Sequence, residues 1–221
     1  MEPDPPDQHQ EWVQALMAPP SLTCEANDSD EILKGLFLGN STAARAASNA
    51  SPVRAIVNCA GRNNSGTIDG VSVFQLPELS AAGIAYLELD MLDGLSSPPL
   101  APFLDKGADF IEECFLKGSS PVLVHCAAGK SRSASCILAF LVKHRGMSLR
   151  DAAILMREKR HRAYPRVHFW EQLRAWEVAT RCIPASSLPA EALALHVDNC
   201  GGQALENDHN KVKKLVEMGF G

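Results

Sequence analysis

The sequence lacks any Cys-x-x-Cys pair, any long uninterrupted apolar run and any excess of positive charge. Its seven cysteines are odd in number and scattered along the chain, which indicates neither a disulfide framework nor a zinc finger. No stretch approaches the ~18 apolar residues that read as a membrane-spanning helix. The first residues, MEPDPPDQHQ, contain no apolar signal core. The net charge of −5 argues against a general nucleic-acid-binding surface, so we expect no strong nucleic-acid partner.

The two ends of the chain also carry no lipidation motif. Glu2 excludes N-terminal myristoylation, and the final residues EMGFG do not form a prenylation box. We therefore expect no membrane anchor. The scattered cysteines and the missing signal core predict a reducing compartment, which is the cytoplasm or the cytoplasm together with the nucleus.

The composition that is present is that of a globular domain with tails. Hydrophobic residues make up 46% of the 221 residues and charged residues 21%. Residues 1–28 are rich in Pro, Asp and Gln, which predicts a disordered tail. Residues 29–181 are expected to form one globular domain, and residues 182–221 a linker and C-terminal tail.

Short apolar runs alternate with helical patterns through the predicted domain. The strand candidates are 32–38, 55–58, 71–75, 84–89 and 122–124. One helix candidate begins after Ser41, and four more cover 103–117, 132–145, 148–159 and 167–181. Ser148 caps the helix at 148–159. This alternation predicts a single α/β domain with a mainly parallel central sheet of about five strands, flanked by helices.

The stretch VHCAAGKSRS, residues 124–133, lies between a strand candidate and a helix candidate. A strand, a tight loop and a helix N-terminus present backbone N–H groups to an anion, which indicates a phosphate site. A nucleotide-binding phosphate loop would need a glycine five residues before Gly129, and that position is Val124. The nucleotide interpretation therefore fails at a required position.

A cysteine nucleophile fits the same stretch at every position. Cys126 follows the strand, where backbone amides and the helix dipole stabilise a thiolate. Five residues separate Cys126 from Arg132, whose guanidinium can bind two oxygens of one phosphate. Gly129 allows the backbone to turn sharply, while Ala127 and Ala128 keep the rim of the site uncrowded. A purely structural role, in which Cys126 is one more small buried side chain, does not explain the spacing to Arg132.

This run, H-C-x-x-G-x-x-R-S, resembles the signature of cysteine-dependent protein tyrosine phosphatases, in particular the small, atypical dual-specificity branch. GLFLGNSTAA and GMSLRDAAILMREKR resemble the opening strand and a later helix of that family. The resemblance implies that Cys126 is the nucleophile, that Arg132 binds phosphate, and that Ser133 helps the thiolate leave. It implies a phosphate-binding ring made of His125, Ala127, Ala128, Gly129, Lys130, Ser131 and Arg132. It calls for neither a metal nor a cofactor.

The leaving group in such a reaction needs a proton from a carboxylic acid. The candidates after the strand at 84–89 are Glu88, Asp90 and Asp93. Asp93 stands at the exit of that strand, and the run from Tyr86 to Asp93 resembles the family's Y-x-x-[ILV]-x-x-x-D pattern. We favour Asp93 over Asp90 as the general acid.

Two further segments allow either a functional or a purely structural interpretation. Residues 157–166 hold five cations, either a solvated helix end or a second anion site at Arg160 and Arg162. The family's N-P-N-x-G-F-like run is here YPRVHF (164–169), which departs from the pattern.

KKLVEMGFG (213–221) resembles the start of a ubiquitin-associated domain, so ubiquitin is a candidate partner, although a single helix cannot bury such a core.

The expected function is hydrolysis of phosphotyrosine and phosphoserine or phosphothreonine on protein substrates through a phosphocysteine intermediate. The alternatives are a phosphoinositide or RNA-end phosphatase and a non-catalytic phosphoprotein-binding adaptor. Lys130 stands where lipid-acting relatives also carry lysine, whereas Ala127 supplies no second charge. Cys126, Arg132 and Asp93 together favour an enzyme over an adaptor.

Overall fold

The computed structural model describes residues 27–48, 52–61, 76–93, 98–190 and 192–193. The described residues up to Ser187 belong to one compact unit, and those from Leu188 onward belong to a second. In the second unit Leu188, Ala192 and Leu193 are buried. The predicted strand 71–75, nearly all of the predicted disordered tail and the ubiquitin-associated-like stretch lie outside the described residues.

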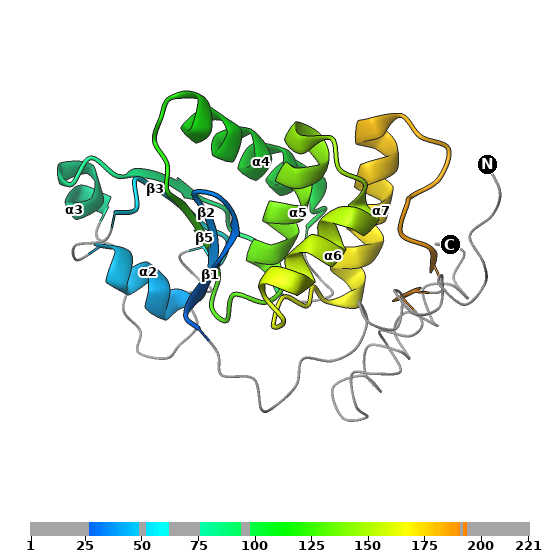
Figure 1. The fold of residues 1–221 in the computed structure, drawn as a ribbon, viewed down its shortest axis with the longest axis horizontal. Helices are drawn as coiled ribbons and strands as arrows, with labels where there is room; N and C mark the ends of the chain where they lie inside the picture. The colour runs from blue at the N-terminus through cyan, green and yellow to red at the C-terminus, as the bar shows by residue number, and fades with distance from the viewer. Residues whose placement is uncertain (1–26, 49–51, 62–75, 94–97, 191, 194–221) are drawn as a thin grey trace. The chain divides into compact units, whose positions relative to one another are not determined.

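A five-stranded sheet forms the centre of the larger unit (Figure 1). Its strands are β1 (Ser29–Leu33), β2 (Leu36–Gly39), β3 (Ala55–Asn58), β4 (Ala85–Glu88) and β5 (Val122–His125). The order across the sheet is β1-β2-β5-β3-β4. Strands β2, β5, β3 and β4 run parallel, and only β1 is antiparallel to its neighbour. The predicted α/β class and mainly parallel sheet are confirmed.

The first strand candidate, 32–38, is wrong as a single strand. The chain turns at Lys34 and Gly35, so that β1 and β2 form a hairpin in which Leu33 faces Leu36. Gly35 has a φ of 79°, which a side chain would disfavour, and its N–H donates to Glu31 Oε1 at 2.8 Å. The apolar run hid the turn because buried apolar residues stand on both sides of it, Ile32 before and Leu36 and Leu38 after.

Helices cover both faces of this sheet (Figure 1). On one face lie α2 (Ser41–Ser48) and α3 (Leu76–Ala81); on the other lie α4 (Ala101–Leu116), α5 (Arg132–Arg145), α6 (Leu149–Lys159) and α7 (Val167–Arg181). Ala44 and Ala47 of α2 pack with Ile56 of β3 and Leu123 of β5. Because side chains alternate along a strand, the neighbouring residues of β3 and β5 face the opposite helical layer.

Helix α5 lies in the middle of that second layer. Its residues from Arg132 to Val142 are all buried. The helix ends at Gly146, whose φ of 67° provides a left-handed cap, and Ser148 Oγ then accepts the Asp151 N–H at 3.0 Å to begin α6. The predicted bounds of α5 and the predicted cap of α6 are confirmed. The buried position of α5 fixes the direction in which its first residues point.

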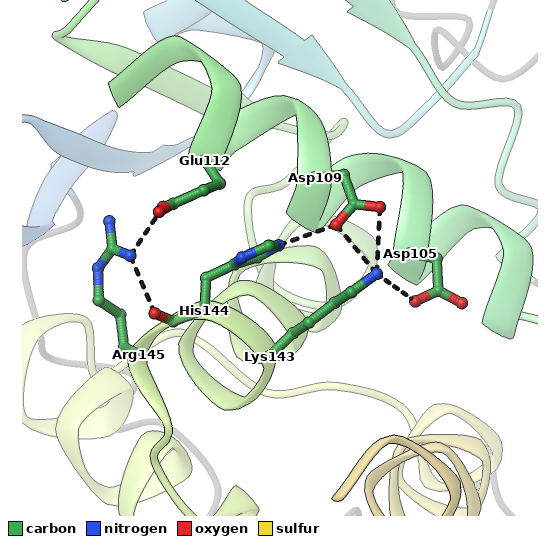
Figure 2. Close-up of polar contacts among 6 residues, drawn as sticks. All are labelled: Asp105, Asp109, Glu112, Lys143, His144 and Arg145. Carbon is green, nitrogen blue, oxygen red and sulfur yellow. Dashed lines mark hydrogen bonds and ion pairs between the residues drawn. The ribbon is translucent and has the colours of Figure 1, made fainter. Parts of the chain in front are cut away.

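Ion pairs join α4 to the C-terminal end of α5 (Figure 2). Lys143 Nζ lies 2.8 Å from Asp105 Oδ1 and 2.9 Å from Asp109 Oδ1. Figure 2 shows three acidic residues of α4 facing three basic residues of α5: Asp105, Asp109, Glu112, Lys143, His144 and Arg145. Closer to the centre, the helices approach so tightly that a Cβ at Gly107 would clash with Cys136 Sγ. These contacts hold α5 against α4 at Cys136 and at the C-terminal end of α5.

A buried carboxylate joins α7 to the start of α6. Glu177 is 0% exposed; its Oε1 accepts the Leu149 N–H at 2.8 Å and its Oε2 accepts the Ser187 N–H at 2.9 Å. Burial alone would raise the pKa of Glu177, but hydrogen bonds from these N–H groups and from the hydroxyls of Ser186 and Ser187 lower it by more. The pKa of Glu177 therefore lies below the ordinary value.

Candidate active site

The loop from Cys126 to Ser131, here called the signature loop, leaves the carboxyl end of β5 and enters α5. Strand β5 pairs with β2 on one side and β3 on the other, so the loop emerges at the centre of the parallel part of the sheet. Gly129 has a φ of 64°, and a Cβ there would lie 2.5 Å from the Gly39 carbonyl oxygen of β2. Both the backbone conformation and this close approach require glycine.

The Cys126 sulfur lies at the bottom of the signature loop, and the residue is 3% exposed. Ser133 Oγ donates a hydrogen bond to Cys126 Sγ at 3.2 Å. Burial raises the pKa of the Cys126 thiol, but the Arg132 guanidinium, the Ser133 hydroxyl and the backbone N–H groups of Ser133 and Lys130 lower it more. The net pKa lies below that of an ordinary cysteine, as a nucleophilic thiolate requires.

His125 is buried beneath the loop and hydrogen-bonds the backbone of Cys126. Burial lowers its pKa to about 4. The imidazole is therefore neutral at ordinary pH and adds no positive charge beside the thiol. The expectation that His125 shapes the surroundings of Cys126 stays a prediction.

Arg132 is the first residue of α5, and its side chain turns back into the loop. The side chain is 6% exposed; Nη1 donates to the Met91 carbonyl oxygen at 3.4 Å and Nη2 lies 3.7 Å from Asp93 Oδ2. Its Nε has no hydrogen-bond partner among the residues that the structure describes. A buried guanidinium that has a free donor and lies beside a thiolate is suited to bind a phosphate group placed next to the Cys126 sulfur.

The structure brings Asp93 to this site and leaves Asp90 outside it. Asp93 Oδ1 lies 2.9 Å from Arg166 Nε, while its other oxygen faces Arg132. Asp90 is exposed and packs against Gly61, where a Cβ would clash with its carboxylate. The geometry favours Asp93 as the general acid, and that role stays a prediction.

The segment 160–166 is fastened to three consecutive residues of the signature loop. Arg160 Nε donates to the Gly129 carbonyl oxygen at 3.1 Å, and the Tyr164 N–H donates to the Lys130 carbonyl oxygen at 2.8 Å. The Arg166 N–H donates to Ser131 Oγ at 3.1 Å. On the opposite side of the loop, the Ser41 N–H donates to the Ala127 carbonyl oxygen at 3.2 Å. The carbonyl oxygens of Ala127, Gly129 and Lys130 are thus held by neighbouring segments.

These contacts correct the prediction of a second anion site at Arg160. The Arg160 side chain is 1% exposed and forms an ion pair with Asp30 of β1, so it presents no charge to solvent. Arg162 is partly exposed, and its part of the hypothesis stays a prediction. The half-exposed cation that does lie beside the site is Arg166, which sequence reasoning did not single out. The only sequence signal for it was that arginine replaces the asparagine expected there from the family pattern.

Among the described residues, no group of three or more His, Cys, Asp or Glu side chains is arranged to hold a metal ion. None of the helices found there is long and apolar enough to span a membrane.

Comparison with known proteins agrees with this geometry. Residues 36–179 match the family model described as "Dual specificity phosphatase, catalytic domain". Because that match covers more than half of the sequence, the chain belongs to the dual specificity phosphatase family.

Three relatives illustrate this membership. Human dual specificity protein phosphatase 21 is 35% identical over 149 residues, which cover 66% of this chain and 70% of the relative. Dual specificity protein phosphatase Mpk3 of Drosophila melanogaster is 39% identical over 111 residues, 50% of this chain but only 26% of that relative's length. The crystal structure of human DUSP28 superimposes with a TM-score of 0.58 and 27% identity, covering 74% of this chain and 99% of that one.

Proposed function

We propose that this protein hydrolyses phosphate monoesters on tyrosine and on serine or threonine of phosphorylated proteins, through a phosphocysteine intermediate. The observation that carries the proposal is the position of the Cys126 sulfur. It lies 3.2 Å from Ser133 Oγ and close enough to the Arg132 guanidinium for that charge to lower the pKa of the thiol. A buried thiol with a lowered pKa, beside a guanidinium and a carboxyl group, is the set of groups that such a reaction needs.

In the first step the Cys126 thiolate attacks phosphorus while Arg132 binds two of the phosphoryl oxygens. The bond from phosphorus to the ester oxygen breaks, and that oxygen takes a proton from the Asp93 carboxyl group. The products are phosphocysteine and the free hydroxyl of the substrate. The loop N–H groups and Arg132 stabilise the charge on the transferring phosphoryl group.

In the second step water attacks the phosphorus of phosphocysteine, and the Asp93 carboxylate accepts a proton from that water. The sulfur–phosphorus bond breaks, and inorganic phosphate leaves. The Cys126 sulfur departs as a thiolate, which the Ser133 hydroxyl stabilises by donating a hydrogen bond.

The test is turnover of a small aryl phosphate by the wild type and by Cys126→Ser. The serine variant should lose turnover but keep its affinity for inorganic phosphate, because Arg132 and the loop amides remain. Near-normal turnover by the variant would contradict the mechanism. A wild type that binds phosphopeptides without turning over any substrate would instead support the adaptor alternative.

The substrate class is tested separately with a panel of phosphopeptides, phosphoinositides and 5′-phosphorylated RNA. We expect the highest kcat/KM with phosphopeptides. A preference for the lipids or the RNA would overturn the protein-substrate part of the proposal and leave the chemistry intact.

The cellular setting is part of the same proposal. A thiolate with a lowered pKa is easily oxidised, so the enzyme needs a reducing compartment such as the cytoplasm or the nucleus. Ubiquitin binding by residues 213–221 stays a prediction, to be tested by titration of ubiquitin into the full chain.

A further inference from the structure

Arg160 is a fully buried cation that contacts the signature loop from behind. It is 2% exposed and is the C-cap residue of α6. Its Nη1 forms an ion pair with the Asp30 carboxylate and donates to the Asn27 carbonyl oxygen at 3.2 Å, while its Nε donates to the Gly129 carbonyl oxygen at 3.1 Å. Burying a charge is costly unless it is paired and hydrogen-bonded, and Arg160 meets this condition through Asp30 and the two carbonyl oxygens.

The Gly129 carbonyl belongs to the same peptide group as the Lys130 N–H. That N–H is one of the backbone donors that lower the pKa of the Cys126 thiol. A trans peptide is planar, and its C=O and N–H point in opposite directions. When Arg160 holds the oxygen on one side of this peptide, it therefore aims the hydrogen at the sulfur on the other side.

The positive charge adds to this geometric effect. A cation bound to a carbonyl oxygen draws electron density away from the N–H of the same peptide and makes that group a stronger donor. The effect is greatest where water is excluded, and both Arg160 and Cys126 are buried. Arg160 can in this way favour the thiolate without touching it.

We propose that Arg160 is a positioning residue for the nucleophile: with Asp30 as its counter-ion, it holds the Gly129–Lys130 peptide so that the Lys130 N–H faces the Cys126 sulfur. This inference rests on the proposed function only in taking Cys126 as the nucleophile. It also assigns a task to Asp30, which lies on β1, 96 positions before Cys126 in the sequence.

The reactivity of Cys126 itself reports on this contact. Alkylation by iodoacetamide, a neutral reagent, follows the thiolate fraction and needs no phosphatase substrate. The titratable or charged groups around Cys126 include Arg132 of α5, His125 of β5, Cys59, which follows β3, and Asp93, whose carboxylate faces Arg132. The pKa of His125 is about 4, and burial and its neighbour Cys136 raise that of Cys59 well above a cysteine's ordinary value. Neither group therefore titrates between pH 5 and 8, where the measurement is made.

The experiment measures the alkylation rate of Cys126, resolved by mass spectrometry of its peptide, against pH. We compare the wild type with Arg160→Met, Arg160→Lys and Asp30→Asn. Loss of one charge-assisted hydrogen bond predicts that alkylation of Arg160→Met at low pH is slower by about 10-fold, and that the difference vanishes at high pH, where the thiol is fully ionised. Arg160→Lys keeps the charge and should lie between Arg160→Met and the wild type.

A matched control separates this effect from lost stability. Glu177→Gln also removes a buried, hydrogen-bonded charge, but on α7 and without contact to the signature loop. It should lower the melting temperature and leave the alkylation profile of Cys126 unchanged. If Arg160→Met does not fold, Arg160→Lys and Asp30→Asn provide the same comparison. Wild-type alkylation profiles in all folded variants, or an equal change in Glu177→Gln, would overturn the proposal.

Discussion

Asp93 Oδ1 lies 2.9 Å from Arg166 Nε, and the opposite oxygen of the same carboxylate lies 3.7 Å from Arg132 Nη2. The carboxylate therefore stands between one cation that lies inside the site and one that is half exposed at its edge. Arg166 also donates its backbone N–H to Ser131 Oγ, so a single residue contacts both the signature loop and the candidate general acid. This relationship joins three segments that are far apart in the sequence.

The first prediction concerns the general acid. Asp93→Asn should slow hydrolysis of esters with poor leaving groups by about 10²–10⁴-fold, because the leaving oxygen no longer receives a proton. Esters whose leaving group needs no proton should lose much less. The measurement is kcat/KM for a series of aryl and alkyl phosphates, with Asp90→Asn as the matched control. A selective loss in Asp90→Asn instead would move the assignment by three residues.

The second prediction concerns Arg166. Arg166→Gln removes one of the two cations that hold the Asp93 carboxylate in place, so we expect a loss of about 3- to 10-fold with poor leaving groups, as for one partly exposed charge contact. The loss with a good leaving group should be smaller, because proton donation matters less there. Lys159→Gln removes an exposed cation from the same region and serves as control. A faster Arg166→Gln enzyme would mean that the ion pair restrains the acid rather than placing it.

The third prediction concerns the second chemical step. Ser133→Ala removes the donor that lies 3.2 Å from the Cys126 sulfur, so thiolate departure from phosphocysteine should slow by about 10- to 100-fold. Rapid-quench measurements should then show a burst of product followed by slow turnover. Ser135→Ala is the matched control, since Ser135 is an equally buried serine that hydrogen-bonds the Ser131 carbonyl oxygen instead. Absence of a burst in Ser133→Ala would show that the first step limits turnover there.

The fourth prediction concerns stability and pH. Glu177→Gln should lower the free energy of unfolding at pH 7 by about 1–3 kcal/mol, because buried N–H and hydroxyl donors lose a charged acceptor. The folded-state pKa of Glu177 lies below the ordinary value, so its contribution is present above the unfolded pKa and is lost as the pH falls through the folded one. Urea titrations between pH 7 and pH 3 should therefore show the two proteins converging in acid. A constant difference across that range would contradict the assigned pKa direction.

The sequence by itself determined the features that depend on neighbouring residues. The nine residues from His125 to Ser133 specify the loop, its cysteine and its arginine, because the candidate site is built within one turn between a strand and a helix. The bounds of α5 and α7 and the Ser148 cap also followed from local patterns, since apolar periodicity and caps act over a few residues. The Lys34–Gly35 turn was a local signal too, and the apolar residues on both sides concealed it.

Only the tertiary structure decided which distant residues meet the signature loop. A run of five cations predicts charge but not direction; the packing of α6 against β1 turned Arg160 inward to Asp30, and the start of α7 placed Arg166 beside Asp93. Asp90 and Asp93 differ by three positions along the chain, yet one packs against Gly61 and the other faces Arg132. Such choices depend on burial and on which segments the sheet order brings together, and neither is encoded in the spacing of nearby residues.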